Sequence, residues 1–88
     1  METEGSTDNV SVRDRLQRAA RDLWSQVIDL GESYVVFIDR RGLHTRVELG
    51  EDGFFRVSWQ DEPSWITFPR TFENPREAAL HAYQGPHD

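Results

Sequence analysis

The strict alternation of residues 43–49 constrains the fold more than any other feature of the sequence. Apolar or β-branched side chains alternate there with polar ones, with Leu43, Thr45, Val47 and Leu49 in one set and His44, Arg46 and Glu48 in the other. Successive side chains of a strand point to opposite faces of its sheet, so this pattern predicts a strand with one face in the core and the other in water. The sheet that contains it is therefore expected to have a free face.

Further strands are expected on both sides of this segment. β-branched and aromatic residues are concentrated in YVVFID, FFRVSW and WITF, and the turn sequences RRG, GEDG and DEPS separate them. We predict an antiparallel meander in which strands 34–39 and 54–59 flank strand 43–49. A short edge strand over 65–68, which ends at Pro69, is expected to follow.

Strand 34–39 is apolar on both sides, which is typical of a central or covered strand. Tyr34, Val36 and Ile38 lie on one side, and Val35 and Phe37 lie on the other. Either side is compatible with the core, so both orientations stay open.

The turn between the second and third strands determines their register. A four-residue loop would place Arg56 on the core face, whereas a three-residue loop with Gly53 in the left-handed conformation aligns Val47 with Val57. The shorter loop also places Glu48 opposite Arg56, which is a favourable cross-strand pair. We predict the shorter loop, with Phe55, Val57 and Trp59 facing the core and with Phe54, Arg56 and Ser58 facing outward.

A helix is predicted before the strands, over residues 11–30. Ser11 and Asp14 have the spacing of a capping box, and Gly31 supplies a stop signal. With a rotation of 100° per residue, one side of this helix carries an apolar stripe, as in a helix that packs on a sheet. The stripe consists of Val12, Leu16, Ala19, Ala20, Leu23, Val27 and Leu30.

Four arginines lie on this predicted helix: Arg13, Arg15, Arg18 and Arg21. Asp14 to Arg18 and Arg18 to Asp22 are both i,i+4 spacings, which predict ion pairs along the helix. We interpret the arginine series as a solvated and locally compensated face, and a contact with RNA, DNA or an acidic partner is the alternative.

A second helix is predicted over residues 75–84. Asn74 as the N-cap, Pro75 at the first helical position and Glu77 at the third make a well-defined start, and Gly85 followed by Pro86 ends the helix. Its apolar face is expected to consist of Ala79, Leu80 and Tyr83.

These elements predict an α+β fold in one domain over residues 11–85. We expect a two-layer arrangement in which helices 11–30 and 75–84 pack on a three- to four-stranded antiparallel meander, in the order α-β-β-β-(β)-α. Residues 1–10 are acidic and lack periodicity, so we expect a disordered tail, and we expect residues 86–88 to form a frayed C-terminus.

The composition bears on the class of function. The 88-residue chain has a net charge of -6, and arginine supplies all ten basic residues. This charge repels phosphate backbones at long range, so nucleic acid is a disfavoured partner and a basic protein surface is a favoured one. There is no cysteine, no apolar run of membrane-spanning length and no signal-peptide pattern, so we expect a cytoplasmic protein without a disulfide or a membrane segment.

No catalytic, metal or cofactor site is predicted. Glu77 and His81 have the i,i+4 spacing of helical metal ligands, but no third ligand accompanies them, and we interpret them as a surface pair. His44 could meet Asp39 across the first predicted hairpin, but the sequence does not determine the turn type that would align them, so no catalytic dyad is predicted. The sequence contains no nucleophile or phosphate-binding motif, so we do not expect an enzyme.

The predicted outer sheet face is the candidate functional surface. It carries Phe54 with Arg46, Arg56 and His44, a combination that is typical of protein-binding patches and of stacking platforms for bases. We expect a small acidic protein-interaction module, of the chaperone, immunity or regulatory-adaptor type, that binds its partner here. A mixed solvated face with one exposed Phe is the alternative.

Trp24 and Ile28 lie beside or outside the apolar stripe of helix 11–30. Both residues could pack under a loop or the sheet edge. They could also form a subunit interface, because a small domain without disulfides gains stability by pairing. A homodimer through Trp24 and Ile28 is therefore a second expectation.

The predicted order of one helix, three strands and one helix resembles two families in topology. It is similar to the double-stranded RNA-binding domain, a resemblance that implies nucleic-acid binding through exposed arginines and Phe54. That family has a basic cluster at the start of its second helix, where this chain has Asn74, Pro75, Arg76 and Glu77. The order also resembles type III secretion chaperones, which implies a small acidic dimer that binds protein segments.

Overall fold

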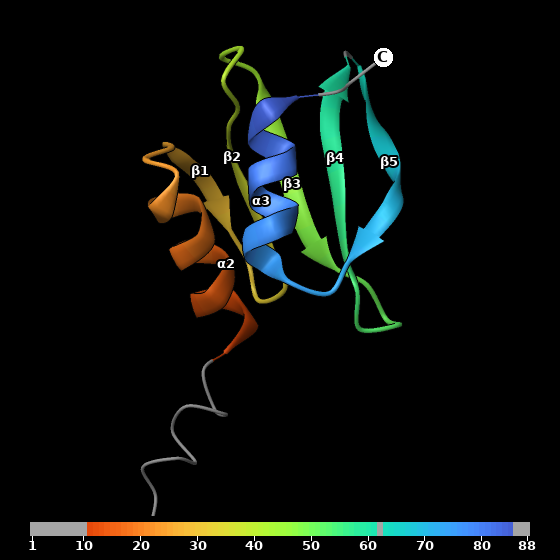
Figure 1. Ribbon diagram of the computed structural model, residues 1–88. Coiled ribbons are helices and arrows are strands. Elements are labelled where there is room, and N and C mark those ends of the chain that lie inside the picture. Colours follow the sequence, from red (N-terminus) through yellow and green to blue (C-terminus); the bar gives the residue numbers. More distant parts are fainter. Residues whose placement is uncertain (1–10, 62, 86–88) are drawn as a thin grey trace, which may run out of the picture.

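The part of the chain that the structure describes forms a five-stranded antiparallel sheet with two helices on one face (Figure 1). The computed structural model describes residues 11–61 and 63–85, and the expectations for residues 1–10 and 86–88 lie outside the described residues. Along the chain the elements are α2 (Val12–Asp22), β1 (Val27–Leu30), β2 (Tyr34–Ile38), β3 (His44–Leu49), β4 (Phe55–Asp61), β5 (Ser64–Phe72) and α3 (Pro75–Gln84). The predicted α+β fold is confirmed, with five strands where three to four were expected.

The additional strand arises because the first helix ends earlier than predicted. Ser11 caps α2 as expected, since its Oγ accepts a hydrogen bond of 3.1 Å from the Asp14 N–H. The helix ends at Asp22, however, and residues 27–30 form β1, which pairs with β2. The prediction of helix 11–30 is therefore wrong from residue 23 onward, and over residues 27–30 pairing with β2 overrides the helical spacing of the apolar residues.

The end of α2 is a turn that usually contains glycine. The Trp24 N–H donates to the Arg21 carbonyl at 2.9 Å, the Ser25 N–H donates to the Ala20 carbonyl at 3.4 Å, and Trp24 has φ of 60°. These bonds have the pattern of a Schellman motif, whose left-handed residue is most often Gly. Because Trp occupies that position here, the sequence shows no stop signal, and Gly31 was wrongly interpreted as one.

The register of β3 and β4 is the predicted one. Val47 pairs with Val57, Glu48 pairs with Arg56, and Gly53 has φ of 87°. Phe55, Val57 and Trp59 are buried as expected. Ser58 lies on the predicted outer side but is also buried, and its Oγ is 3.2 Å from the Thr67 hydroxyl oxygen on β5.

The two sides of β2 are now assigned. Val35 and Phe37 are fully buried under the helices, whereas Tyr34, Val36 and Ile38 face the opposite side and are only partly buried. The core consists of these inward residues of the sheet together with Leu16, Ala19 and Ala20 of α2 and the alanines of α3.

Two residues that were predicted to face the core are exposed. Leu43 precedes β3 in the turn that follows Asp39, and Leu80 lies on the open side of α3. The buried side of α3 is made by Pro75, Ala78, Ala79 and Ala82 instead. Small side chains therefore carry the contact of this helix, which lets it lie close to α2 and to the sheet.

The predicted edge strand is longer than expected. β5 extends over Ser64–Phe72 and includes Pro69, with a register shift opposite Arg56 and Ser58 of β4. Proline is tolerated there because an edge strand needs hydrogen bonds on one side only. After β5, the chain enters α3 through the predicted cap, in which Asn74 Oδ1 accepts a hydrogen bond of 2.7 Å from the Arg76 N–H.

Candidate functional site

The side of the sheet opposite the helices, called the outer face below, is covered by no helix in the described part of the chain (Figure 1). Its side chains come from all five strands of the sheet: Asp29 of β1, Tyr34, Val36 and Ile38 of β2, His44, Arg46 and Glu48 of β3, Arg56, Ser58 and Gln60 of β4, and Trp65 and Thr67 of β5. Most are partly buried by one another. A mixed apolar and charged surface of this kind is suited to a macromolecular partner.

Arg46 on the middle strand β3 and Trp65 on the edge strand β5 are in contact on the outer face. The guanidinium carbon of Arg46 lies 4.8 Å from the centroid of the Trp65 ring, within the range of a cation–π interaction. Arg46 Nε is also 3.4 Å from Glu48 Oε1. Trp65 was missed as a site residue because its orientation depends on the register of β4 with β5, in which it pairs with Gln60.

Arg56 is held by Asp52 in the hairpin that precedes β4. Its two terminal nitrogens donate hydrogen bonds of 3.1 Å and 3.0 Å to the two carboxylate oxygens of Asp52. The hydrogen bonds from Arg56 and from the Phe54 N–H lower the pKa of the Asp52 carboxyl, and the Asp52 carboxylate raises the pKa of Arg56. This pairing fixes the direction of the Arg56 side chain beside Phe54, which is 37% exposed.

The four predicted partner-binding residues do not form one compact patch. Phe54 and Arg56 lie near the hairpin end of β4, whereas His44 is at the other end of β3, next to Thr45, which pairs with Trp59. Trp59 is five residues beyond Phe54, a separation of roughly 17 Å along a strand. Arg46 lies between these two ends of the outer face, so it connects Phe54 and Arg56 with His44.

The residue pairs Asp39–His44 and Glu77–His81 were considered above as candidates for catalysis and metal binding. In the structure, Asp39 and His81 have contacts that stabilise the fold. Asp39 is buried and closes the turn before β3, where it accepts hydrogen bonds from the N–H groups of Arg41 at 2.8 Å and Leu43 at 3.0 Å and from the Arg41 guanidinium at 2.9 Å. His81 packs against aromatic rings, with its centroid 4.4 Å from that of Phe68. Within residues 11–61 and 63–85, no group of three or more candidate metal ligands is found.

Trp24 and Ile28 are exposed, but neither lies on a helix. Trp24 is 95% exposed at the turn after α2, and Ile28 is 43% exposed at the bulge of the edge strand β1. Packing of Trp24 under a loop, the structural alternative, is therefore wrong. Self-association through these two side chains stays a prediction.

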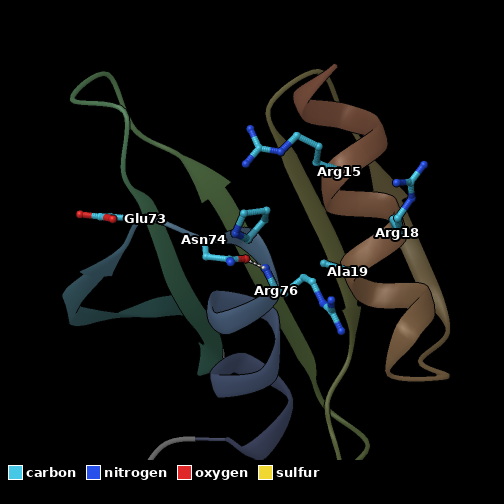
Figure 2. Close-up of a pocket in the computed structure, with 7 residues that line it drawn as sticks. Arg15, Arg18, Ala19, Glu73, Asn74 and Arg76 are labelled. Carbon is cyan, nitrogen blue, oxygen red and sulfur yellow. Dashed lines mark hydrogen bonds between the residues drawn. The ribbon is translucent and has the colours of Figure 1, made fainter. Parts of the chain in front are cut away.

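A groove between α2 and α3 is a second candidate site (Figure 2). One hollow of about 380 Å³ is lined by Arg15 and Arg18 of α2 and by Arg76 at the start of α3. A second hollow of about 260 Å³ is lined by Leu23 at the end of α2 and by Leu80 of α3. Ala19 and Arg76 line both hollows, so the two lie next to each other along the helices. We call this feature the interhelical groove.

The predicted i,i+4 ion pairs of α2 are absent from the described residues. No carboxylate lies within 4.0 Å of Arg15 or Arg18, and Asp22 is 3.8 Å from Arg76 instead. All four arginines of α2 are exposed, as expected of a solvated face, but the expected compensation by ion pairs along the helix is wrong. The groove was missed because it depends on how two helices far apart in sequence pack together.

Comparison with protein-family models, curated protein sequences and solved structures finds no match for this chain. Among the described helices, none has the length and apolarity needed to cross a bilayer. Function is therefore inferred from the chemistry of the outer face and the interhelical groove.

Proposed function

We propose that this protein is a non-enzymatic protein-interaction module that binds a protein partner through its outer face. The observation that carries the proposal is the contact of Arg46, on the middle strand, with Trp65, on the edge strand, on a sheet face that no described helix covers. Trp and Arg are the side chains most enriched among residues that dominate binding energy, and both tend to lie near the middle of an interface. An adaptor, chaperone or immunity role in the cytoplasm is consistent with this chemistry.

The arrangement favours binding over a mixed surface. Val36 and Ile38 supply half-buried apolar area next to Arg46, and Arg56 and Phe54 extend the surface towards the hairpin. Arg56 is oriented by Asp52 before any partner arrives, so less side-chain entropy is lost on binding. The net charge of -6 steers the chain towards a basic partner at long range, while the outer face supplies short-range affinity.

The test is affinity capture followed by calorimetry with variants of the outer face. Phe54→Ala, Arg56→Ala and Trp65→Ala should each weaken binding of the recovered protein by more than about 1 kcal/mol while changing the melting temperature little. Arg13→Ala, which removes an exposed arginine from the opposite side of the molecule, is the matched control and should bind normally.

Nucleic acid is the competing partner, through the same arginines and Phe54. Binding of mixed single- and double-stranded nucleic acid at low salt, with a steep loss of affinity as salt rises, would replace protein binding as the function. If all three outer-face variants bind the recovered protein as well as the parent does, the outer face is not the interface.

A further inference from the structure

The interhelical groove lies on the helical side of the molecule and differs in charge from the rest of the chain. The chain as a whole is acidic, yet three arginines line one end of this groove. Figure 2 shows Arg15 and Arg76 projecting from the two helices into the space between them, while Glu73 points away. Glu73 also lines this end, and the carboxylates of Asp22 and Glu77 line the other, so the excess of positive charge is confined to the arginine end of the groove.

The arginines at the basic end are available to a ligand. Arg15 and Arg18 have no carboxylate within ion-pair distance among the described residues, and the contact of Arg76 with Asp22 is long, at 3.8 Å, between exposed side chains. The guanidinium carbon of Arg15 lies 5.9 Å from the centroid of the Phe55 ring, which orients the side chain without neutralising it. Guanidinium groups in this state favour carboxylates, which they can bind through paired hydrogen bonds.

The other end of the groove combines the apolar side chains of Leu23 and Leu80 with the charged side chains of Asp22, Arg76 and Glu77. Leu80 is 47% exposed and faces the hollow that Leu23 and Ala19 also line. Leu23 is eight residues from Arg15, so the apolar end lies about 12 Å along the helix axis from the basic end. A ligand that fits both ends must carry negative charge and an apolar side chain at a matching distance.

We propose that the interhelical groove binds an acidic segment of a partner protein that carries one apolar anchor residue. The carboxylates of the segment bind Arg15 and Arg18, and its anchor packs between Leu23 and Leu80. The separation of about 12 Å corresponds to about four residues of an extended segment or about eight residues of a helical one. This site is separate from the outer face, so it does not depend on the function proposed above.

The probe is a library of random displayed peptides, selected against the full chain. The enriched peptides should carry Glu or Asp together with one aliphatic or aromatic residue. The two should be separated by about four residues in an extended peptide or by about eight in a helical one. A fluorescein-labelled synthetic copy of the most enriched peptide is then titrated by fluorescence polarisation. We expect Arg15→Gln with Arg18→Gln, and separately Leu80→Ser, to weaken its binding by about tenfold or more. Binding should also weaken as sodium chloride is raised.

Two controls separate this site from its surroundings. Arg13→Gln changes an arginine of the same helix that does not line the groove, and it should alter the affinity by no more than about twofold. Trp65→Ala should leave peptide binding unchanged, so a failure of the outer face and a failure of the groove give different results. Circular dichroism melting confirms that each variant is folded.

Several results would overturn the proposal. They are a failure to enrich peptides, enrichment of basic or neutral peptides, and equal binding to the Arg15→Gln/Arg18→Gln variant. The acidic residues that precede α2 are a competing occupant, tested with Glu2→Gln, Glu4→Gln and Asp8→Asn together in the full chain. If that variant binds the peptide about tenfold more tightly, the groove belongs to the chain's own N-terminal segment and not to a partner.

Discussion

The indole Nε1 of Trp59 donates a hydrogen bond of 3.0 Å to the backbone carbonyl oxygen of Ala82. Trp59 is on β4 and Ala82 is near the end of α3, so one buried side chain joins the sheet to the helix that covers it. The same carbonyl accepts a bond of 3.2 Å from the Gly85 N–H, which closes the end of the helix. The core and the last turn of α3 therefore share one acceptor.

Replacing Trp59 with Phe tests this connection. The substitution keeps an aromatic ring but removes the donor and part of the buried volume, so we expect the free energy of unfolding to fall by about 2–3 kcal/mol. Urea denaturation measures the change. Trp65→Phe on the outer face is the matched control and should cost less than about 1 kcal/mol, and equal losses for the two variants would contradict the proposed role.

Gly53 is predicted to be required for its backbone conformation alone. Its φ is 87°, and a β-carbon built there would have no heavy atom within 4 Å. Gly53→Val should therefore destabilise the protein by about 1–2 kcal/mol through strain and not through a clash. Gly53→Asn should cost less, because Asn tolerates the left-handed region. Equal costs for Asn and Val in urea denaturation would show that another interaction is involved.

Trp24 is predicted to lower the stability of the monomer. It has φ of 60° at the end of α2 and is almost fully exposed, so it adds strain without burial. Trp24→Gly should raise the free energy of unfolding by about 1 kcal/mol. Thermal melts at low concentration check this. A loss of stability there would mean that the indole has a packing role within the monomer.

A separate prediction is that the protein self-associates through Trp24 and Ile28. If these side chains form a subunit interface, light scattering should give a mass above 10.3 kDa at high micromolar concentration. Trp24→Ser and Ile28→Ser should each return the mass towards that of the monomer, because apolar area leaves the interface. A monomer at high micromolar concentration would end this hypothesis.

The Asp52–Arg56 pair predicts a pH dependence with a defined sign. The hydrogen bonds from Arg56 lower the pKa of the Asp52 carboxyl in the folded protein. Its contribution to stability is therefore present above the ordinary pKa of an aspartate and is lost as the pH falls through the lowered value. Carboxyl NMR titration should show this pKa rising towards its ordinary range in Arg56→Gln, and an unchanged pKa would contradict the pairing.

Local patterns predicted the central strands and the second helix. The alternation in residues 43–49 and the turn at Gly53 determine the pairing of β3 with β4, and Asn74 with Pro75 determines the start of α3. These signals act between residues close in sequence, so they are visible without the structure.

The features that the sequence did not predict depend on contacts between segments that are distant in sequence. Residues 27–30 have apolar spacings that fit a helix, and only their pairing with β2 makes them a strand. On the candidate site, Arg46, Arg56 and Phe54 were placed on the outer face by alternation. Trp65 was not, because its side depends on the irregular pairing of β4 with β5. The interhelical groove depends on the packing of α2 beside α3, which no local pattern encodes.

The strand order β1-β2-β3-β4-β5 also bears on how the chain folds. Every strand pairs with its neighbour in sequence, so each hairpin closes only a short loop, at a small cost in chain entropy. Sheets built from such local pairings have a low contact order and fold faster than sheets with distant pairings. The inner strand edges, which pair in the finished sheet, are then exposed only briefly on a partly folded chain, and this limits aggregation during synthesis. Among the described strands, the outer edges of β1 and β5 stay unpaired in the folded sheet.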